Sequence, residues 1–531
     1  MKKKVLALLL AGTMALGLAA CGGSTADKSG DSAATEETSK EEGGSSDTPL
    51  VVGYSPFNAK FSPFFCETAY DQDVQTMTNI TLLTTDREGA VVYKGIEGET
   101  RAYNGTDYTY NGPADCVVTE NEDGTVFYDF TLKDGIKFSD GEPVTIDDVI
   151  FSMYVRCDPT YDGSATLFSQ PIEGMEDYRS GMSNLFKLIY DAGEDNTDFS
   201  LWTEEEQKAF WPAYKKAAED FVGAIAQYCV DNGITKKADD ISGALGAWGF
   251  SVDKKASAYE GFEAMMKQYE GDISSLSSTE VAPGGTPFSD LMEGFADYQV
   301  GVKTGKSAKS IKGIQKTGDN TLRIVATKVD ATLIYQLAVE IAPLHYYGSK
   351  DLYDYDKNMF GFEKGDLSSV RAKTTEPLGA GPYVFKKYEN GVVNFEANPD
   401  YFLGAPKIKY LNFREVQDVD KLNGVINGEI DVTDPSFSKD TADAIASANS
   451  NGEVSGDKIM TKTVDFLGYG YIGINANNLS VDGKAGSDES KNLRRAFATI
   501  FSVYRDVAID SYYGEAAEVI NYPISNTSWA A

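Results

Sequence analysis

The sequence predicts an α/β protein whose strands form mixed sheets, and three observations support this class. Two β-rich hairpins, over Cys116–Leu132 and Tyr383–Asn398, turn at Asp-Gly and Asn-Gly pairs, which accept the positive φ angles of tight turns. Capping patterns at Thr145 and Thr203 open helices with apolar residues at helical spacing. Strands and helices follow one another without strict alternation, which favours mixed sheets over purely parallel ones.

In the first half of the chain, Val51–Tyr54 is expected to be a strand because it is a short apolar run. A helix begins after Thr145, with Asp148 completing a capping box. Residues 160 to about 310 are expected to form amphipathic helices, one of them opened by the Thr203 and Glu206 capping box. We interpret its aromatic and aliphatic stripe as core packing rather than as a ligand box; the stripe comprises Phe210, Tyr214, Ala217, Phe221, Ile225 and Tyr228.

In the second half, β-rich runs predict strands at Asn320–Thr327 and Leu411–Val416, on either side of the second hairpin. Leu333–Tyr347 is expected to be a helix followed by a proline turn, and Leu422–Ile426 a short helix ending near Gly428. Phe466–Asn475 is rich in Tyr, Ile and Gly. The last predicted element is a helix over Asn492–Ile509, with one apolar face formed by Leu493, Ala496, Phe497, Ile500 and Val503.

The amino-acid composition excludes several classes of function. The 531 residues are 42% hydrophobic, enough for large cores and two to four domains or lobes. The formal charge of −33 argues against nucleic acid as a partner, because phosphates require Lys and Arg. The single histidine, His345, leaves little metal or acid–base chemistry, and we expect it to be packed or on the surface rather than a catalytic base. The sequence therefore predicts a binding protein without metal or cofactor, rather than an enzyme.

The first twenty residues are typical of an export signal. Lys2, Lys3 and Lys4 precede an apolar run from Val5 to Ala20. The run ends at Leu18-Ala19-Ala20-Cys21-Gly22, which resembles the lipobox of bacterial lipoproteins. This resemblance implies cleavage before Cys21 and lipidation of that cysteine; the alternative is an ordinary signal peptide with a chance cysteine. Residues 21–48 are expected to form a flexible acidic tether, because they hold no aromatic or branched aliphatic residue.

The folded part contains four further cysteines, Cys66, Cys116, Cys157 and Cys229. No two of them have the C-x-x-C spacing of a metal knuckle or redox pair. Export permits disulfides, but a chain of this length does not require them. We expect buried free thiols, with disulfides as the alternative.

Four segments together resemble the family-5 extracytoplasmic solute-binding proteins, which serve peptide and nickel ABC importers. The first is residues 130–151, FTLKDGIKFSDGEPVTIDDVIF. The second is residues 378–413, with a Gly-x-Gly-Pro-Tyr strand, a hairpin and an Asn-Pro-Asp-Tyr turn. The third is the Asn-Gly-Glu-Ile-Asp run at 427–431, and the fourth is residues 473–506, with an Arg-Arg-Ala helix start.

The resemblance implies a clamshell of two large mixed-sheet lobes, with a smaller lobe inserted in the first. We assign residues 49–80 and 321–464 to the first lobe, 81–320 to the smaller lobe, and 465–531 to the start of the second large lobe. Peptide ligands are expected between the lobes, held mainly by hydrogen bonds to their backbone. Such bonds give affinity that does not depend on the ligand's side chains. The implied partners are ABC permease subunits, and the protein is expected to be a monomer anchored by lipid to the outer face of the bacterial cytoplasmic membrane.

The sequence departs from the family pattern in two places. The helical stretch near 170–310 is longer than usual. The chain also stops at Ala531, where family members continue for well over a hundred residues that complete the second lobe. We expect a truncated gene product or partial sequence with an incomplete second lobe; the alternative is a short natural member.

The resemblance also implies two cleft-lining segments. The loop after the first strand corresponds to Thr68, Ala69 and Tyr70, and the crossover strand into the second lobe corresponds to Tyr469, Gly470 and Tyr471. Tyrosine offers a flat apolar face with one polar tip, which suits variable peptide side chains. Ordinary core or hinge packing is the alternative role for these residues.

Three functions therefore remain open. The first is peptide capture for an ABC importer. The second keeps the fold but binds a nickel chelate, heme or an oligosaccharide, although the lone His345 makes a metal chelate less suitable. The third is a surface lipoprotein of adhesive or enzymatic function.

Overall fold

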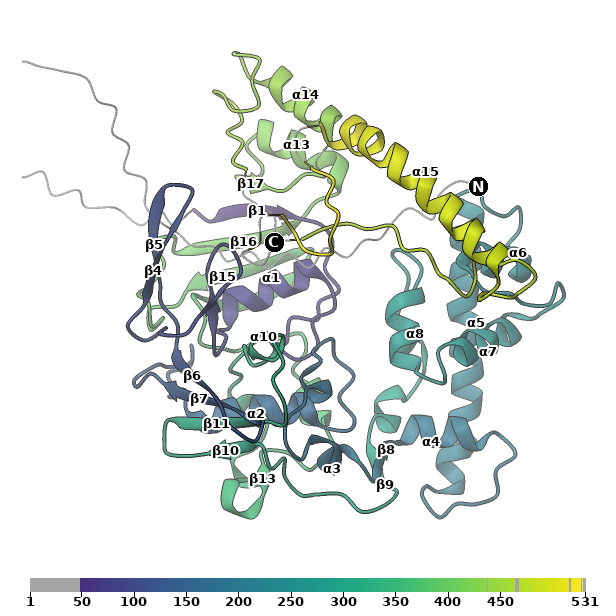
Figure 1. Cartoon of the computed structure of the whole chain (residues 1–531), viewed down its shortest axis with the longest axis horizontal. Helices are drawn as coiled ribbons and strands as arrows, with labels where there is room; N and C mark the ends of the chain where they lie inside the picture. Colours follow the sequence, from purple (N-terminus) through teal and green to yellow (C-terminus); the bar gives the residue numbers. More distant parts are fainter. Residues whose placement is uncertain (1–47, 437, 464–467, 515–516, 527, 529–531) are drawn as a thin grey trace, which may run out of the picture.

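The computed structural model describes residues 48–436, 438–463, 468–514, 517–526 and 528, and contains two main sheets beside a group of helices (Figure 1). The larger sheet has the strand order β14-β15-β16-β1-β17. β1 runs parallel to β16 and β17, whereas β14, β15 and β16 are antiparallel, so the sheet is mixed as predicted. Its strands are β1 (Leu50–Tyr54), β14 (Tyr383–Glu389), β15 (Val392–Ala397), β16 (Tyr410–Glu415) and β17 (Val432–Thr433).

Helix α1 (Ala69–Thr78) covers one face of this sheet. Its buried Val74 and Met77 pack with Phe395 and Phe413 of the sheet in one apolar cluster. The hairpin of β14 and β15 turns where predicted, because Asn390 and Gly391 both have positive φ, 52° and 72°.

The second main sheet is antiparallel, with the order β10-β11-β7-β6. It consists of β6 (Ala114–Glu120), β7 (Val126–Leu132), β10 (Ile314–Lys316) and β11 (Thr321–Ala326). Because β10 pairs with β11, this sheet continues past residue 320, the boundary that we assigned between the smaller lobe and the first lobe. Helix α2 (Ile146–Cys157) shares its core, and the hydroxyl and amide of Thr145 donate to Asp148 at 2.7 and 2.8 Å, as the capping box predicts.

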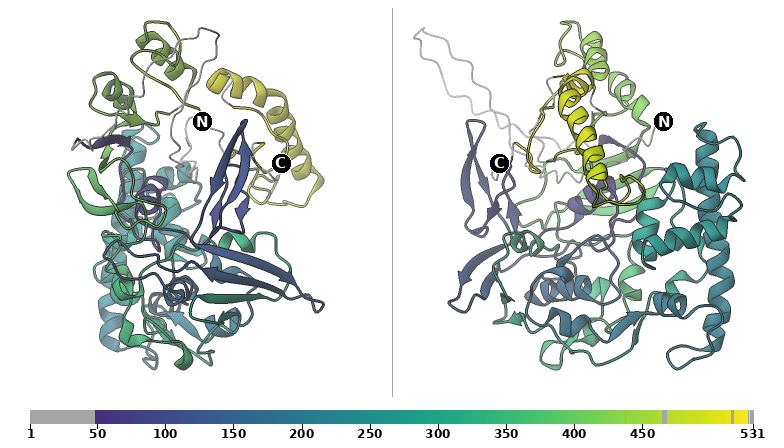
Figure 2. Two further views of the ribbon diagram at one scale, coloured as in Figure 1. Left: turned by 90° about the vertical axis from the view of Figure 1, so that its left-hand side faces the viewer. Right: turned by 45° about the vertical axis from the view of Figure 1, so that its right-hand side comes forward.

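The predicted amphipathic helices form a group of their own, which lies to one side of both sheets in Figure 1 and in the right view of Figure 2. The long helix α5 begins at a capping box in which the amide of Thr203 donates to Glu206 at 2.6 Å. The predicted stripe on α5 is confirmed as core: five of its six residues are buried and Tyr228 is partly buried. The group contains α4 (Leu185–Ala192), α5 (Glu204–Asp231), α6 (Ile241–Trp248), α7 (Ala258–Gln268), α8 (Ile273–Glu280) and α9 (Phe288–Leu291).

Further strands and helices lie outside these three groups. The remaining strands are β2 (Thr84–Thr85), β3 (Val91–Val92), β4 (Glu99–Tyr103), β5 (Thr106–Tyr110), β8 (Met182–Asn184), β9 (Gly301–Lys303), β12 (Tyr353–Asp354) and β13 (Met359–Phe360). The remaining α-helices are α3 (Met175–Arg179), α10 (Leu333–Gln336), α11 (Leu344–Tyr347), α12 (Ser368–Arg371), α13 (Asp418–Ile426), α14 (Lys439–Ala448) and α15 (Asp488–Tyr513).

The Gly-x-Gly-Pro-Tyr motif has a steric explanation. A Cβ atom at Gly379 would lie 2.3 Å from the carbonyl oxygen of Thr78, and one at Gly381 would lie 2.4 Å from its carbonyl carbon. The amide of Gly381 donates to the same carbonyl oxygen at 2.9 Å. Glycine is therefore required because the backbone leading into β14 touches the C-terminal end of α1.

The helix followed by a proline turn that the sequence predicts over Leu333–Tyr347 begins where expected, but its predicted extent is wrong. The structure has only α10 and α11 there, separated by an extended segment. That segment pairs with residues 80–82, since the amide of Leu82 donates to Val339 and the amide of Ile341 donates to Ile80. Pro343 also disfavours helical geometry at the residue before it.

Helix α15 confirms the predicted helix and is longer at both ends. It lies beside α14, apart from both sheets (Figure 1). Its apolar face is largely uncovered: Phe497, Ile500 and Val503 are exposed. Across the described ranges, no helix has both the length and the apolar character needed to cross a membrane.

The four cysteines of the folded part form no disulfide with one another, as expected. Cys116, Cys157 and Cys229 are buried and Cys66 is partly buried. The proposed lipidation site Cys21 lies outside the described residues. Residues 464–467 also lie outside them, and the last two of these begin the Phe466–Asn475 region.

Candidate functional site

The parallel strands of the larger sheet end together at one edge. β1 ends at Tyr54, opposite Glu415 at the end of β16, and Gly53 lies opposite Thr433 at the end of β17. Open α/β sheets bind ligands outside the carboxyl ends of their parallel strands. We call this region the carboxyl edge: the ends of β1, β16 and β17 together with the first turn of α1, whose Tyr70 contacts Tyr54.

Of the first predicted segment, Thr68 is the N-cap of α1, and its hydroxyl oxygen accepts from the amide of Asp71 at 3.1 Å. Ala69 is the first residue of the helix. Tyr70 is partly exposed, and its ring meets that of Tyr54 edge-on, with centroids 5.8 Å apart. The structure therefore places this segment at the carboxyl edge, where Thr68 caps the helix, and its role in lining a ligand cleft stays a prediction.

Tyr54 and Asp73 form the base of the edge. The Tyr54 ring packs with its centroid 4.4 Å from that of Phe413, and its hydroxyl interacts with the Asp73 carboxyl group. Burial raises the pKa of Asp73 to about 6, even though the interaction with Tyr54 lowers it. Burial also raises the pKa of Tyr54, so its hydroxyl stays protonated and can donate.

The second predicted segment is more exposed. Tyr469 and Tyr471 are 39% and 72% exposed, their rings lie 6.3 Å apart, and neither belongs to a strand. Gly470 has open space around it. In the part of the chain that the structure describes, no recorded hydrogen bond or ring contact joins this segment to Tyr70, so a shared site stays a prediction.

Sequence reasoning missed Lys421 and Asp434, which also lie at the carboxyl edge. The Lys421 ammonium contacts the hydroxyl of Ser55, directly after β1, at 3.3 Å, and the backbone oxygen of Asp434, directly after β17, at 3.1 Å. No local pattern marks these residues, because their partners are distant in the sequence.

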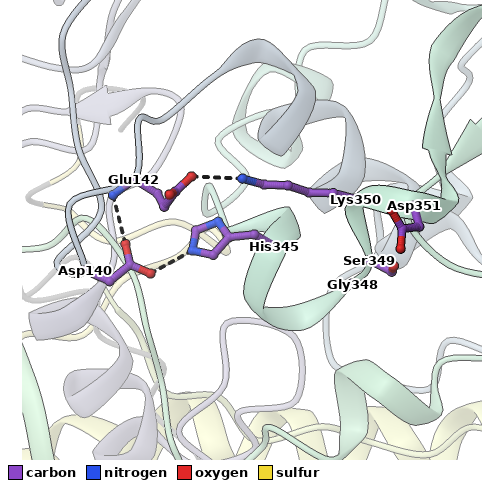
Figure 3. A pocket seen from close by; sticks show the side chains of 7 residues that line it. All are labelled: Asp140, Glu142, His345, Gly348, Ser349, Lys350 and Asp351. Atoms are coloured by element: carbon purple, nitrogen blue, oxygen red, sulfur yellow. Dashed lines mark hydrogen bonds and ion pairs between the residues drawn. The ribbon is translucent and has the colours of Figure 1, made fainter.

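His345 lies in a separate shallow hollow of about 560 Å³ (Figure 3). Its Nε2 is 2.7 Å from Asp140, and Lys350 pairs with Glu142 at 2.8 Å. The ring also meets Phe138 edge-on at 5.7 Å. These pairs tie the turn before α2 to α11 and to Lys350 just after it, so His345 is partly buried among ion pairs, within the range we expected of a packed or surface residue. Over the described ranges, no group of three or more His, Cys, Asp or Glu side chains is placed to hold a metal ion.

The fold is that of a mixed α/β protein, and the comparison with known families identifies the family to which it belongs. The model for bacterial extracellular solute-binding proteins, family 5 Middle, matches residues 110–228 and 252–531. The chain belongs to this family. All four segments on which the resemblance was based lie within the match. Residues 1–109 precede the match, and the gap between its two parts, residues 229–251, lies in the helical group.

Several curated proteins are similar to parts of the chain. The oligopeptide-binding protein AppA of Bacillus subtilis is 24% identical over 325 residues, covering 58% of this chain and 54% of AppA. A probable di/tripeptide-binding protein of Pseudomonas aeruginosa is 32% identical over 124 residues, covering 23% and 22%. The heme-binding protein A of Haemophilus influenzae is 26% identical over 133 residues, covering 25% and 22%. The chain thus spans about half the length of AppA and less of the others.

Solved structures show similarity at low identity. AppA of Bacillus subtilis in complex with a nonapeptide has 15% identity and a TM-score of 0.35, covering 72% of this chain and 43% of AppA. The closed lactococcal OppA with an endogenous peptide has 14% identity and a TM-score of 0.38, covering 73% and 46%.

Proposed function

We propose that this family-5 solute-binding protein captures peptides and delivers them to the permease of an ABC importer. The observation that carries the proposal is the carboxyl edge, where Tyr54 and Tyr70 lie beside hydrogen-bonding groups in a protein of this family. The relatives named for oligopeptides and di/tripeptides support the same ligand class.

In this proposal, the peptide is held by hydrogen bonds to its main chain, which give affinity for many sequences. Tyr70 contributes a flat apolar face and a polar tip to variable side chains. Tyr469, Gly470 and Tyr471 line the cleft from the crossover into the second lobe. Closure of the lobes excludes water and strengthens the hydrogen bonds. The mechanism includes no enzymatic step and no cofactor.

The proposed location follows from the family and the N-terminal pattern. Family-5 proteins act outside the cytoplasm. We propose that a lipid on Cys21 anchors the protein, as a monomer, to the outer face of the cytoplasmic membrane, and that residues 22–48 tether the folded part. Replacing Cys21 by serine should release the protein from the membrane fraction, whereas Cys66→Ser should leave it attached.

Calorimetry on the full-length protein tests the ligand class. We expect saturable binding of peptides of two to ten residues, and Tyr70→Ala should weaken it about three- to tenfold, the usual worth of one aromatic contact. Tyr93→Ala, which removes an exposed tyrosine from the assigned smaller lobe, is the control and should leave affinity unchanged. Binding of heme, a nickel chelate or an oligosaccharide without any peptide would contradict the peptide assignment.

A further inference from the structure

Lys421 is an unusually buried lysine. It lies in the first turn of α13, and its side chain is only 1% exposed. A lysine is rarely so buried unless its charge is paired, because an unpaired ammonium loses its hydration without compensation. The partners of Lys421 therefore indicate what its charge does.

All of these partners belong to the carboxyl edge or adjoin it. The ammonium lies 3.3 Å from the Ser55 hydroxyl, and 3.1 and 3.4 Å from the backbone and carboxylate oxygens of Asp434. It is 3.5 Å from Asp418, at the start of its own helix, and 5.7 Å from the centre of the Tyr70 ring. One cation thus contacts Ser55 after β1 and Asp434 after β17, and it lies over the ring of Tyr70, the tyrosine that is predicted to contact the ligand.

The paired carboxylates are not buried with it. The side chain of Asp434 is 53% exposed and that of Asp418 is 47% exposed. Asp73, which interacts with Tyr54, is a third carboxyl group at this edge and lies near Asp434. A single ammonium therefore offsets negative charge at an edge whose carboxylates remain in reach of a ligand.

We propose that Lys421 is a positioning and charge-setting residue of the ligand site: it orients Asp434 and Tyr70 and makes the carboxyl edge tolerant of acidic peptide side chains. This inference rests on the proposed peptide function. Without the ammonium, the edge would carry one more uncompensated negative charge, favouring a lysine-bearing ligand over a glutamate-bearing one.

The test measures affinity for two peptides of equal length that differ only by Lys or Glu at one position. In the full-length protein, Lys421→Met should raise the ratio of Lys-peptide to Glu-peptide affinity about tenfold, because a close unit charge acts oppositely on the two ligands. Lys421→Arg should keep the wild-type ratio. Lys439→Met is the matched control: it removes the same charge from an exposed position of α14, and should not change the ratio.

If Lys421 has a purely structural role, Lys421→Met lowers both affinities alike and leaves their ratio unchanged, and this result overturns the inference. Peptide binding by the wild type would still uphold the proposed function. An equal change in Lys439→Met also overturns it, since net charge alone would then be responsible. If Lys421→Met does not fold, Lys421→Gln gives the same neutral comparison. A wild-type protein that binds neither peptide contradicts the proposed function, and the inference falls with it.

Discussion

Gly381 provides a sharp test of how the family's Gly-x-Gly-Pro-Tyr motif shapes the site. In Gly381→Ala, the new Cβ would lie 2.4 Å from the carbonyl carbon of Thr78 and 2.6 Å from both the amide nitrogen of Asn79 and the carbonyl oxygen of Met77. All three are backbone atoms and cannot rotate away. Ordinary contact begins at 3.4 Å, so the end of α1 and the chain before β14 must separate.

The cost can be worked from these contacts. Overpacking of a tight contact costs about 1–3 kcal/mol. The separation also weakens the 2.9 Å hydrogen bond from the Gly381 amide to Thr78, worth about 1 kcal/mol. We therefore expect Gly381→Ala to lower the free energy of unfolding by about 2–4 kcal/mol.

Urea unfolding followed by circular dichroism measures this loss. Gly246→Ala in α6 is the matched control, because its Cβ meets nothing within 4 Å. A helical Gly-to-Ala change there should be neutral or stabilise the protein by up to about 1 kcal/mol. If Gly381→Ala stays within about 0.5 kcal/mol of the wild type, the backbone contact does not hold α1 in place.

Three further outcomes are expected. Asp148→Ala should cost about 2–4 kcal/mol in urea unfolding, because Asp148 accepts from the amides of Thr145 and Leu344 at 2.8 and 2.9 Å; a loss below 0.5 kcal/mol would contradict this. Burial raises the pKa values of Asp71 and Asp73 from 3.8 to about 6. The stability that their protonated forms contribute is therefore complete below pH about 4 and is lost as the pH rises through 6. Asp73→Asn should flatten the decline of the urea midpoint between pH 4 and 7, and an unchanged slope would refute the assignment. Cys66, Cys116, Cys157 and Cys229 form no disulfide with one another, so a reducing agent should leave the melting temperature unchanged, whereas a clear drop would reveal a disulfide.

Local signals made much of the fold predictable. The turn at Asn390-Gly391 needs two positive φ angles, which these residues accept easily, and the caps at Thr145 and Thr203 satisfy their helix ends with nearby carboxylates. These interactions span two to four residues, so they can be read from the sequence.

Features that depend on distant partners were not predictable. The segment after α10 has apolar residues that suit a helix, but its backbone pairs with residues 80–82. Lys421 looks like a surface residue of a short helix, yet it contacts Ser55, 366 positions away. The resemblance predicts a ligand-contacting role for Tyr70 from its place after the first strand, whereas none of the four segments includes Lys421.

Photo-crosslinking tests most directly whether a peptide binds at the carboxyl edge. A peptide with a benzophenone side chain would be bound to the full-length protein, irradiated, and its adducts mapped by mass spectrometry. The account predicts adducts within Thr68–Tyr70 and within Tyr469–Tyr471, and their loss when unlabelled peptide competes. Adducts confined to another surface, such as the hollow lined by Asp140 and His345, would contradict it.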